Sequence, residues 1–180
     1  MFERMFSYLR AAWPTIRVVA TFVGLIVAFF GTLTYTPIVE RVDVAWVLAK
    51  SAASVSWVML EGVGRLGGFS VNLDGTNLSS GTFIVDVSPA CSGAVPSMIY
   101  LAAVCAYPAS WRAKLLGAFL GLAIIYGVNL IRVVALFLIG LFATQFFHET
   151  HVYIAQALVV AIAVATWLYW AGRYADAPGR

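Results

Sequence analysis

The most constraining feature of the chain is an apolar run from Leu115 to Phe147, in which Arg132 is the only charged residue. A straight helix of these 33 residues would be about 50 Å long, whereas the hydrocarbon core of a bilayer is about 30 Å thick. We therefore expect the run to cross the membrane by about Ile131, and residues 133–147 to lie along or dip into the outer leaflet. Arg132 would then lie near one face of the membrane.

The composition indicates an integral membrane protein, because 62% of the residues are hydrophobic and 11% are charged, against about 25% charged in soluble domains. The net charge of +3 is dispersed and does not favour nucleic-acid binding. We expect an all-α membrane protein with about four transmembrane helices, an interfacial or re-entrant helix and a small extracytoplasmic β-like segment. Residues 1–180 should form one domain, with a first span at 16–35, an extracytoplasmic segment at 37–90 and a helical core at 88–172 that holds spans at 88–107, 115–131 and 152–171.

Residues 37–90 interrupt the apolar pattern. Lys50 lies near the middle of Val42–Val63, and a lysine at the bilayer centre would cost on the order of 3 kcal/mol. This segment is expected to be an amphipathic helix on the outer surface. The alternative, a second span, would invert the topology of everything that follows. From Gly67 to Val87, turn residues separate short β-rich runs, which predicts a small hairpin or extended segment outside the bilayer.

The basic residues favour one orientation. On this layout the cytoplasmic side holds seven lysines and arginines, at positions 4, 10, 17, 112, 114, 173 and 180, whereas residues 37–90 hold three. Because cytoplasmic loops are enriched in basic residues, the N-terminus, the loop 108–114 and the C-terminus are expected in the cytoplasm.

Cys91 follows the polar segment and opens an apolar stretch. At the start of a helix, its thiolate would be favoured by the positive end of the helix dipole, and Ser92 and Gly93 would permit a close approach by a substrate backbone. The alternative is a small apolar residue at a helix end. Cys105 is 14 residues away, about 21 Å along a continuous helix, too far for a disulfide.

Arg132 is expensive inside a membrane and needs a partner. Asn129, three residues earlier, would share its helical face and orient the guanidinium, whose donors suit a developing oxyanion. The alternative is an arginine that reaches the lipid headgroups.

His148 and His151 precede the last apolar segment and would share one helical face. Either could act as a general base near neutral pH, or as an interfacial histidine without chemistry. The spacing of histidine, cysteine and Glu149 fits no zinc motif, so neither a metal nor a cofactor is expected. The Gly117–Gly121 spacing fits close packing between membrane helices.

Four motifs in this order resemble the exosortase/archaeosortase family of membrane cysteine transpeptidases, closest to its short exosortase H type. They are Ala90-Cys91-Ser92-Gly93, Tyr107-Pro108-Ala109-Ser110-Trp111-Arg112-Ala113-Lys114-Leu115-Leu116-Gly117, Asn129-Leu130-Ile131-Arg132-Val133, and His151-Val152-Tyr153-Ile154-Ala155-Gln156. The resemblance covers roughly residues 86–172. The chain departs from the family at Ala155, where a tryptophan is frequent, and lacks a glycine four residues after either histidine.

The resemblance implies a catalytic set of Cys91, Arg132 and His151, with Tyr153 and Gln156 as supporting residues and His148 as the alternative base. It implies a bacterial inner-membrane enzyme whose site lies near the extracytoplasmic face. Such an enzyme cleaves the C-terminal sorting tail of exported proteins through a cysteine acyl-enzyme and transfers them to an acceptor. The expected partners are therefore the tail helix of the substrate and membrane lipids. Two alternatives stay open: a small membrane carrier, and a non-catalytic assembly factor for surface proteins, with Arg132 as an anion or lipid-phosphate site.

Overall fold

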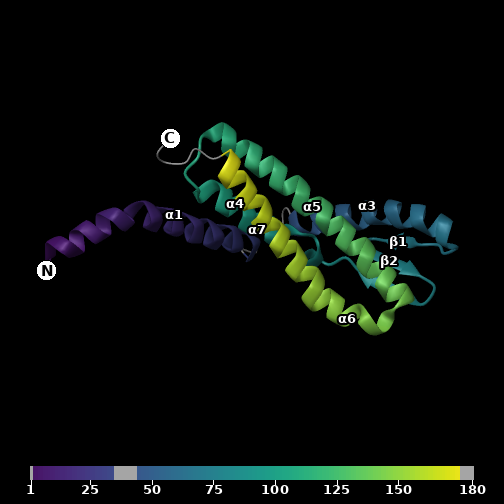
Figure 1. The fold of residues 1–180 in the computed structure, drawn as a ribbon. Coiled ribbons are helices and arrows are strands. Elements are labelled where there is room, and N and C mark those ends of the chain that lie inside the picture. The colour runs from purple at the N-terminus through teal and green to yellow at the C-terminus, as the bar shows by residue number, and fades with distance from the viewer. Residues whose placement is uncertain (1, 35–43, 175–180) are drawn as a thin grey trace.

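The computed structural model describes residues 2–34 and 44–174, and these are mostly helical (Figure 1). Helices α1 and α3 come first, followed by three short strands, a 3₁₀ turn, and the helices α4, α5 and α7. The bounds are α1 Phe2–Thr34, α3 Val44–Gly67, β1 Asn72–Asp74, β2 Asn77–Ser80, β3 Phe83–Asp86, η1 Pro89–Cys91, α4 Ala94–Ala106, α5 Trp111–Phe142, η2 Thr144–Phe146, α6 Phe147–Glu149, a π-helical turn η3 Thr150–Ile154, and α7 Ala155–Arg173.

Helices α5 and α7 form a long hairpin. Ser110 caps the start of α5 by accepting a hydrogen bond from the Ala113 N–H at 3.4 Å. α5 then continues through Arg132 to Phe142 as one helix, so the expected end of the span near Ile131 is not a break in the helix. Whether residues 133–147 lie along or dip into the outer leaflet stays a prediction. The second half of α5 is held by packing that the sequence pattern does not reveal, because α3, β3 and α6 all contact α5. The chain reverses at η2 and α6 instead (Figure 1).

The glycines of α5 let two aromatic side chains pack against its backbone. A Cβ atom on Gly117 would overlap the indole of Trp170 in α7, and one on Gly121 would overlap the ring of Tyr100 in α4. Both rings also donate hydrogen bonds to α5, from the Trp170 indole to the Ala113 carbonyl at 2.8 Å and from the Tyr100 hydroxyl to the Gly117 carbonyl at 3.0 Å. The close helix packing predicted from the glycine spacing is therefore confirmed.

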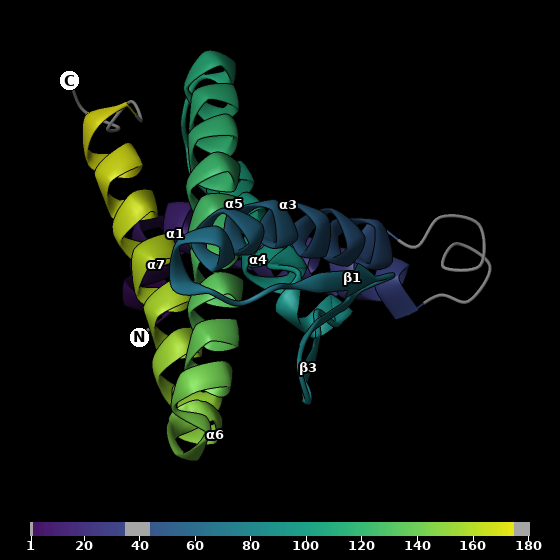
Figure 2. The ribbon, with the colours of Figure 1, turned by 90° about the vertical axis from the view of Figure 1, so that its right-hand side faces the viewer.

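Helix α3 buries one face against α5 and the sheet. Its buried residues recur at helical spacing, whereas Lys50 is exposed. They are Ala49, Ala52, Ala53, Ser56 and Leu60. Figure 2 shows that α3 crosses α5 rather than running beside it. The exposed face carries large apolar side chains such as Val47, Val58 and Leu66 as well as Lys50. The helix begins and ends close to the predicted bounds, and its amphipathic position on a membrane surface stays a prediction.

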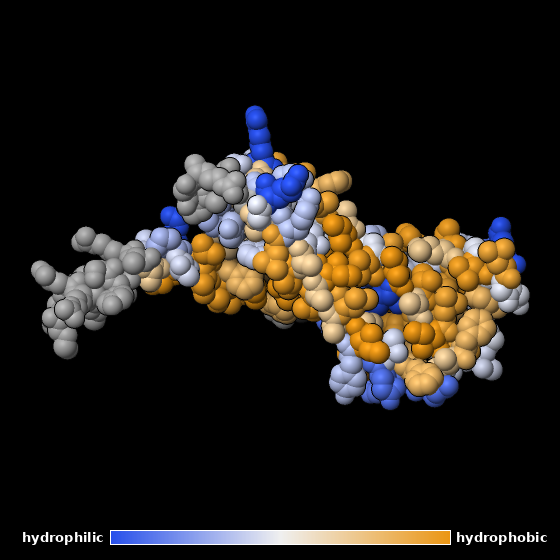
Figure 3. All heavy atoms as spheres, viewed as in Figure 1, coloured by the Kyte–Doolittle hydropathy of each residue, from blue (hydrophilic) through white to orange (hydrophobic). Residues whose placement is uncertain are grey.

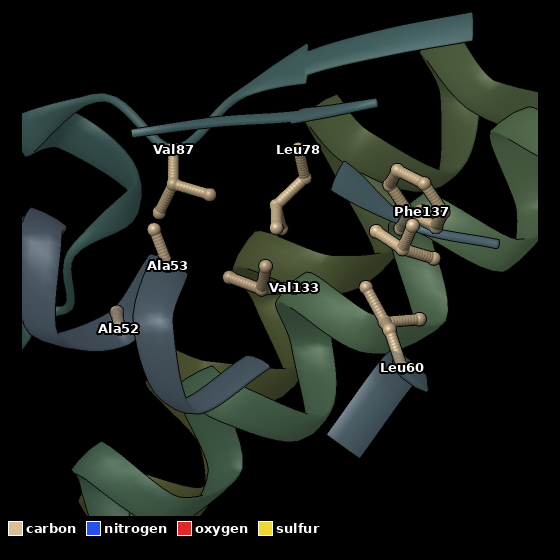
Figure 4. Packing of buried hydrophobic residues seen from close by; sticks show 8 residues of the cluster. Ala52, Ala53, Leu60, Leu78, Val87, Val133 and Phe137 are labelled. Carbon is tan, nitrogen blue, oxygen red and sulfur yellow. The ribbon is translucent and has the colours of Figure 1, made fainter. Parts of the chain in front are cut away.

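The strands form an antiparallel sheet in the order β1-β2-β3 within the described residues. One face of the sheet packs on α3 and α5 (Figure 4). Val87 lies beside Ala53, and Leu78 of β2 belongs to the same buried cluster as Leu60, Val133 and Phe137. At β3, the Phe83 ring occupies the space beside Gly140 of α5. The sheet is thereby fixed against the second half of α5, the half that contains Arg132.

Within the described residues, three helical segments are long and apolar enough to cross a membrane: Ala12–Gly31, Trp111–Phe142 and Thr144–Arg173. The predicted span 88–107 is shorter than expected, because its first residues form η1 and α4 begins at Ala94. Hydrophilic side chains gather where α5 begins and α7 ends, and again around α6, with hydrophobic surface between them (Figure 3). The structure thus contains a long apolar hairpin with polar ends.

Candidate active site

Cys91 ends the 3₁₀ turn η1 and precedes α4, instead of beginning a long helix as expected. Its N–H donates to the Ser88 carbonyl at 2.8 Å. Pro89 starts the turn, where its missing N–H is not needed, and Gly93 follows with φ of 78°, the left-handed region that glycine adopts without steric cost. The local sequence therefore builds a compact turn that presents Cys91 ahead of α4.

Asn129 of α5 holds this turn in place. It is fully buried, and its side-chain amide donates to the Cys91 carbonyl at 2.7 Å. A Cβ atom on Gly93 would lie 3.2 Å from the Asn129 Cγ, so the glycine permits the close approach of Asn129, and an approach by a substrate stays a prediction. The expected contact with Arg132 is also present, but longer, at 3.5 Å from a guanidinium nitrogen to Asn129 Oδ1. Asn129 thus links Cys91 to Arg132.

Ser92 closes the same turn. It is 1% exposed, and its hydroxyl donates to the Pro89 carbonyl at 2.7 Å and accepts from the Ala94 N–H at 3.2 Å. Ser92 is therefore committed to the turn itself and stabilises the start of α4.

A cavity of about 340 Å³ brings together Cys91 from η1, Arg132 from α5 and His151 from the π-helical turn. These residues lie in three separate segments of the chain. Apolar side chains form much of the wall, among them Val133, Leu136 and Phe147. A thiol, a guanidinium and an imidazole thus face one space that is large enough for part of a polypeptide.

Two polar atoms at this cavity are buried without a hydrogen-bond partner among the described residues: Nε of Arg132 and Nδ1 of His151. The His151 ring stacks on Phe147, with centroids 5.8 Å apart and an interplanar angle of 6°. Buried polar atoms in folded proteins are normally satisfied, so unpaired ones at a cavity are suited to bind a ligand.

The two histidines differ in position. His151 lines the cavity, whereas His148 lies in α6, is exposed and does not line it. The backbone from Phe147 to Thr150 is helical, so the two histidines lie three residues apart on one helix, and His151 itself belongs to the π-helical turn Thr150–Ile154. The sequence alone gave no signal of this turn.

The two supporting residues from the last motif lie elsewhere. Tyr153 is 66% exposed and does not line the cavity. Gln156 lines a different, apolar groove of about 460 Å³ between α1, α4 and α7. Cys105 is exposed near the end of α4, and neither cysteine is in a disulfide within the described part of the chain.

The sheet contributes residues that sequence reasoning missed. Phe83, Ile84, Val85, Asp86, Val87 and Ser88 all line the cavity of Cys91. Asp86 also accepts a hydrogen bond from the Thr76 hydroxyl at 2.7 Å. No motif pointed to this segment, because its contact with the cavity depends on how the sheet packs on α5. Among the described residues, no group of three or more histidine, cysteine, aspartate or glutamate side chains could hold a metal ion.

These features describe a helical membrane protein with a largely apolar cavity lined by a thiol, a guanidinium and an imidazole. The family model for transmembrane exosortase (Exosortase_EpsH) matches residues 5–170. The chain therefore belongs to the transmembrane exosortase family, in agreement with its resemblance to the exosortase H type. Family and apolar helices together make it a multi-pass membrane protein. No curated protein and no solved structure gives a significant match.

Proposed function

We propose that the protein is a membrane cysteine transpeptidase of the sortase type, with Cys91 as nucleophile, Arg132 as oxyanion stabiliser and His151 as general acid and base. The observation that carries the proposal is the common cavity of these three side chains. Family membership supports an enzyme over the carrier and assembly-factor alternatives. It suggests the reaction class, and the residue roles rest on the geometry and the motifs.

The first half of the reaction would form a thioester. The Cys91 thiolate attacks the carbonyl carbon of a substrate peptide bond, and negative charge develops on the carbonyl oxygen. The Arg132 guanidinium stabilises this oxyanion, since Nε and its neighbouring nitrogens lack strong partners within the described residues. The carbon–nitrogen bond then breaks, and protonated His151 gives its proton to the leaving amine.

The second half would release the product. An acceptor amine, hydroxyl or water attacks the thioester carbonyl, and neutral His151 takes the proton of the nucleophile. Arg132 stabilises the second oxyanion. Collapse of this intermediate breaks the carbon–sulfur bond and regenerates the Cys91 thiolate.

The proposed substrate is an exported protein with a C-terminal tail: a short recognition segment, one transmembrane helix and a basic end. Its cleavage would take place near the extracytoplasmic face of the bacterial cytoplasmic membrane. Arg132 is 21 residues from Trp111, about 32 Å along α5, which is close to the thickness of the hydrocarbon core. If the basic end of α5 is cytoplasmic, Arg132 lies near the outer face.

Two experiments test the proposal. Co-expression with an exported reporter that carries such a tail should give a size shift, and Cys91→Ala should abolish it. Continued cleavage by Cys91→Ala would refute the mechanism. Topology reporters fused after Gly75 and after Ala109 should report outside and cytoplasm, respectively. A cytoplasmic signal at Gly75 would refute the outer placement of the site.

A further inference from the structure

The cavity of Cys91 runs along one edge of the sheet. Consecutive residues of a strand point to opposite faces, so a cavity against one face contacts alternate residues. Here six consecutive residues, Phe83 to Ser88, line the same cavity as Cys91. Residues from both faces of β3 therefore border the cavity, which indicates that the cavity lies along the outer edge of β3.

The register shows which backbone groups face that edge. The Val87 N–H donates to the Thr76 carbonyl at 3.0 Å, and the β2–β3 pairs continue from there as Asn77–Asp86, Leu78–Val85 and Ser79–Ile84. In an antiparallel ladder, hydrogen-bonded pairs alternate with pairs that do not exchange hydrogen bonds. Val85 therefore bonds to β2, whereas the N–H and C=O groups of Ile84 and Asp86 point away from β2.

The two edges of the sheet differ. β1 forms the opposite edge and packs against α3. β3 contacts α5 through Phe83 and Val85, which pack on the apolar core from one face. Ile84 on the other face is 65% exposed. The edge of β3 thus offers backbone donors and acceptors beside a cavity with apolar walls, where hydrogen bonds are stronger than in water.

We propose that β3 binds the recognition segment of the substrate as an added fourth strand, by hydrogen bonds from the backbone of Ile84 and Asp86. The occupant is an extended polypeptide, because only an extended backbone matches the spacing of alternate N–H and C=O groups along a strand edge. The chain continues from β3 through Ser88 into the turn that carries Cys91, so a paired segment would bring a peptide carbonyl to the thiol. This inference rests on the proposed function and adds the mode of substrate recognition.

Strand addition has a consequence for specificity. Alternate residues of the bound segment would face the apolar walls formed by Val133, Leu136 and Phe147, and those between would face the opposite side. Substituting the recognition segment one residue at a time should therefore change cleavage with a period of two.

The test compares two substitutions of one exposed side chain. Ile84→Pro removes the N–H that points away from β2 and places a proline ring on the edge of β3. The hydrogen bonds between β3 and β2 should remain, because Val85 makes them. Ile84→Thr changes the same side chain and keeps the N–H. With a reporter bearing a C-terminal sorting tail, Ile84→Pro should cleave at least about tenfold more slowly than Ile84→Thr, from one lost hydrogen bond and steric exclusion of the strand. Equal rates for the two variants would overturn the proposal.

Two further measurements separate folding and function from recognition. Labelling of Cys91 by a small thiol reagent should proceed at similar rates in both variants. Slower labelling in Ile84→Pro alone would mean that the substitution disturbs the turn that carries Cys91. A photocrosslinking amino acid at position 84 in a Cys91→Ala background then tests directly whether the substrate lies along β3. It should capture the reporter within a few residues of the scissile bond, and no capture would overturn strand addition.

If Cys91→Ala still cleaves, the proposed function fails. If Cys91→Ala is inactive and Ile84→Pro matches Ile84→Thr, only the strand proposal fails.

Discussion

The two sides of the cavity are held in different ways. On one side, the Cys91 turn is fixed by hydrogen bonds from Asn129, Ser92 and its own backbone, and both side chains are almost completely buried. On the other side, His151 lies on a π-helical turn, stacks on Phe147 and has a buried Nδ1 without a partner among the described residues. Cys91, the proposed nucleophile, thus has a fixed position, whereas the His151 imidazole keeps a nitrogen without a hydrogen-bond partner among the described residues.

The two sides of the cavity should therefore respond differently to substitution. Changes on the Cys91 side should alter stability together with activity, because they break packing and hydrogen bonds of the resting protein. Changes at His151 should alter activity with little loss of stability, because the side chain contributes one ring contact to the fold.

After Cys91→Ala, which should abolish cleavage, the largest effect is expected at His151. His151→Ala should reduce tail cleavage by about 10²–10⁴-fold, the usual contribution of a general acid and base. His148→Ala is the matched control and should keep most of the activity, because His148 is exposed and does not line the cavity. The size shift of a co-expressed tailed reporter measures the cleavage activity of both variants. Loss of activity in His148→Ala with an active His151→Ala would reverse the assignment.

Asn129→Leu should show the coupled behaviour of the fixed side. It removes the donor to the partly buried Cys91 carbonyl, and a buried acceptor left without a partner costs about 1–3 kcal/mol at most. The midpoint of thermal unfolding in detergent should fall, and cleavage should fall with it because the thiol is no longer positioned. A variant with the unfolding midpoint and cleavage rate of the wild type would show that Asn129 does not hold the turn.

A smaller effect is expected for Gly93→Ala. The left-handed backbone at φ of 78° costs about 1–2 kcal/mol for a residue with a Cβ atom, and that atom would also press on Asn129. Gly127→Ala is the control, because a Cβ atom there has nothing within 4 Å and alanine favours a helix. Thermal unfolding should show destabilisation at Gly93 and none at Gly127. Equal stability of the two variants would contradict the role of the left-handed turn.

The smallest effect is expected for Cys105→Ala. Cys105 is exposed near the end of α4 and lies outside the cavity, so its thiol takes no part in the proposed reaction. Its replacement should leave the rate of reporter cleavage within about twofold of the wild-type rate. For comparison, a tenfold change in rate corresponds to about 1.4 kcal/mol. A large loss of cleavage would show that a second thiol is needed.

Much of the architecture could be predicted because it depends on local patterns. Apolar length identified the long helices, the segment Val42–Val63 predicted a helix close to the bounds of α3, and the glycine spacing in α5 predicted close helix packing. The path beyond Arg132 could not be predicted, because α5 is extended to Phe142 by contacts with α3 and the sheet. Hydropathy records none of these contacts.

The candidate site divides in the same way. Cys91, Arg132 and His151 stood out through charge, position and motif, and their catalytic roles stay predictions. The hydrogen bond from Asn129 to Cys91 spans 38 residues, and the cavity edge formed by β3 depends on tertiary packing, so neither had a local signal. The π-helical turn that carries His151 also had no signal in the hydropathy pattern.

The central claim is that Cys91 forms a covalent acyl intermediate in the cavity it shares with Arg132 and His151. The most direct measurement is peptide mapping by mass spectrometry after acid quenching of the full-length protein with a tailed reporter. We predict that the peptide containing Cys91 carries the new C-terminus of the reporter as a thioester, and that hydroxylamine releases it as a hydroxamate. An adduct on Cys105, or cleavage that continues in Cys91→Ala without any adduct, would contradict the account.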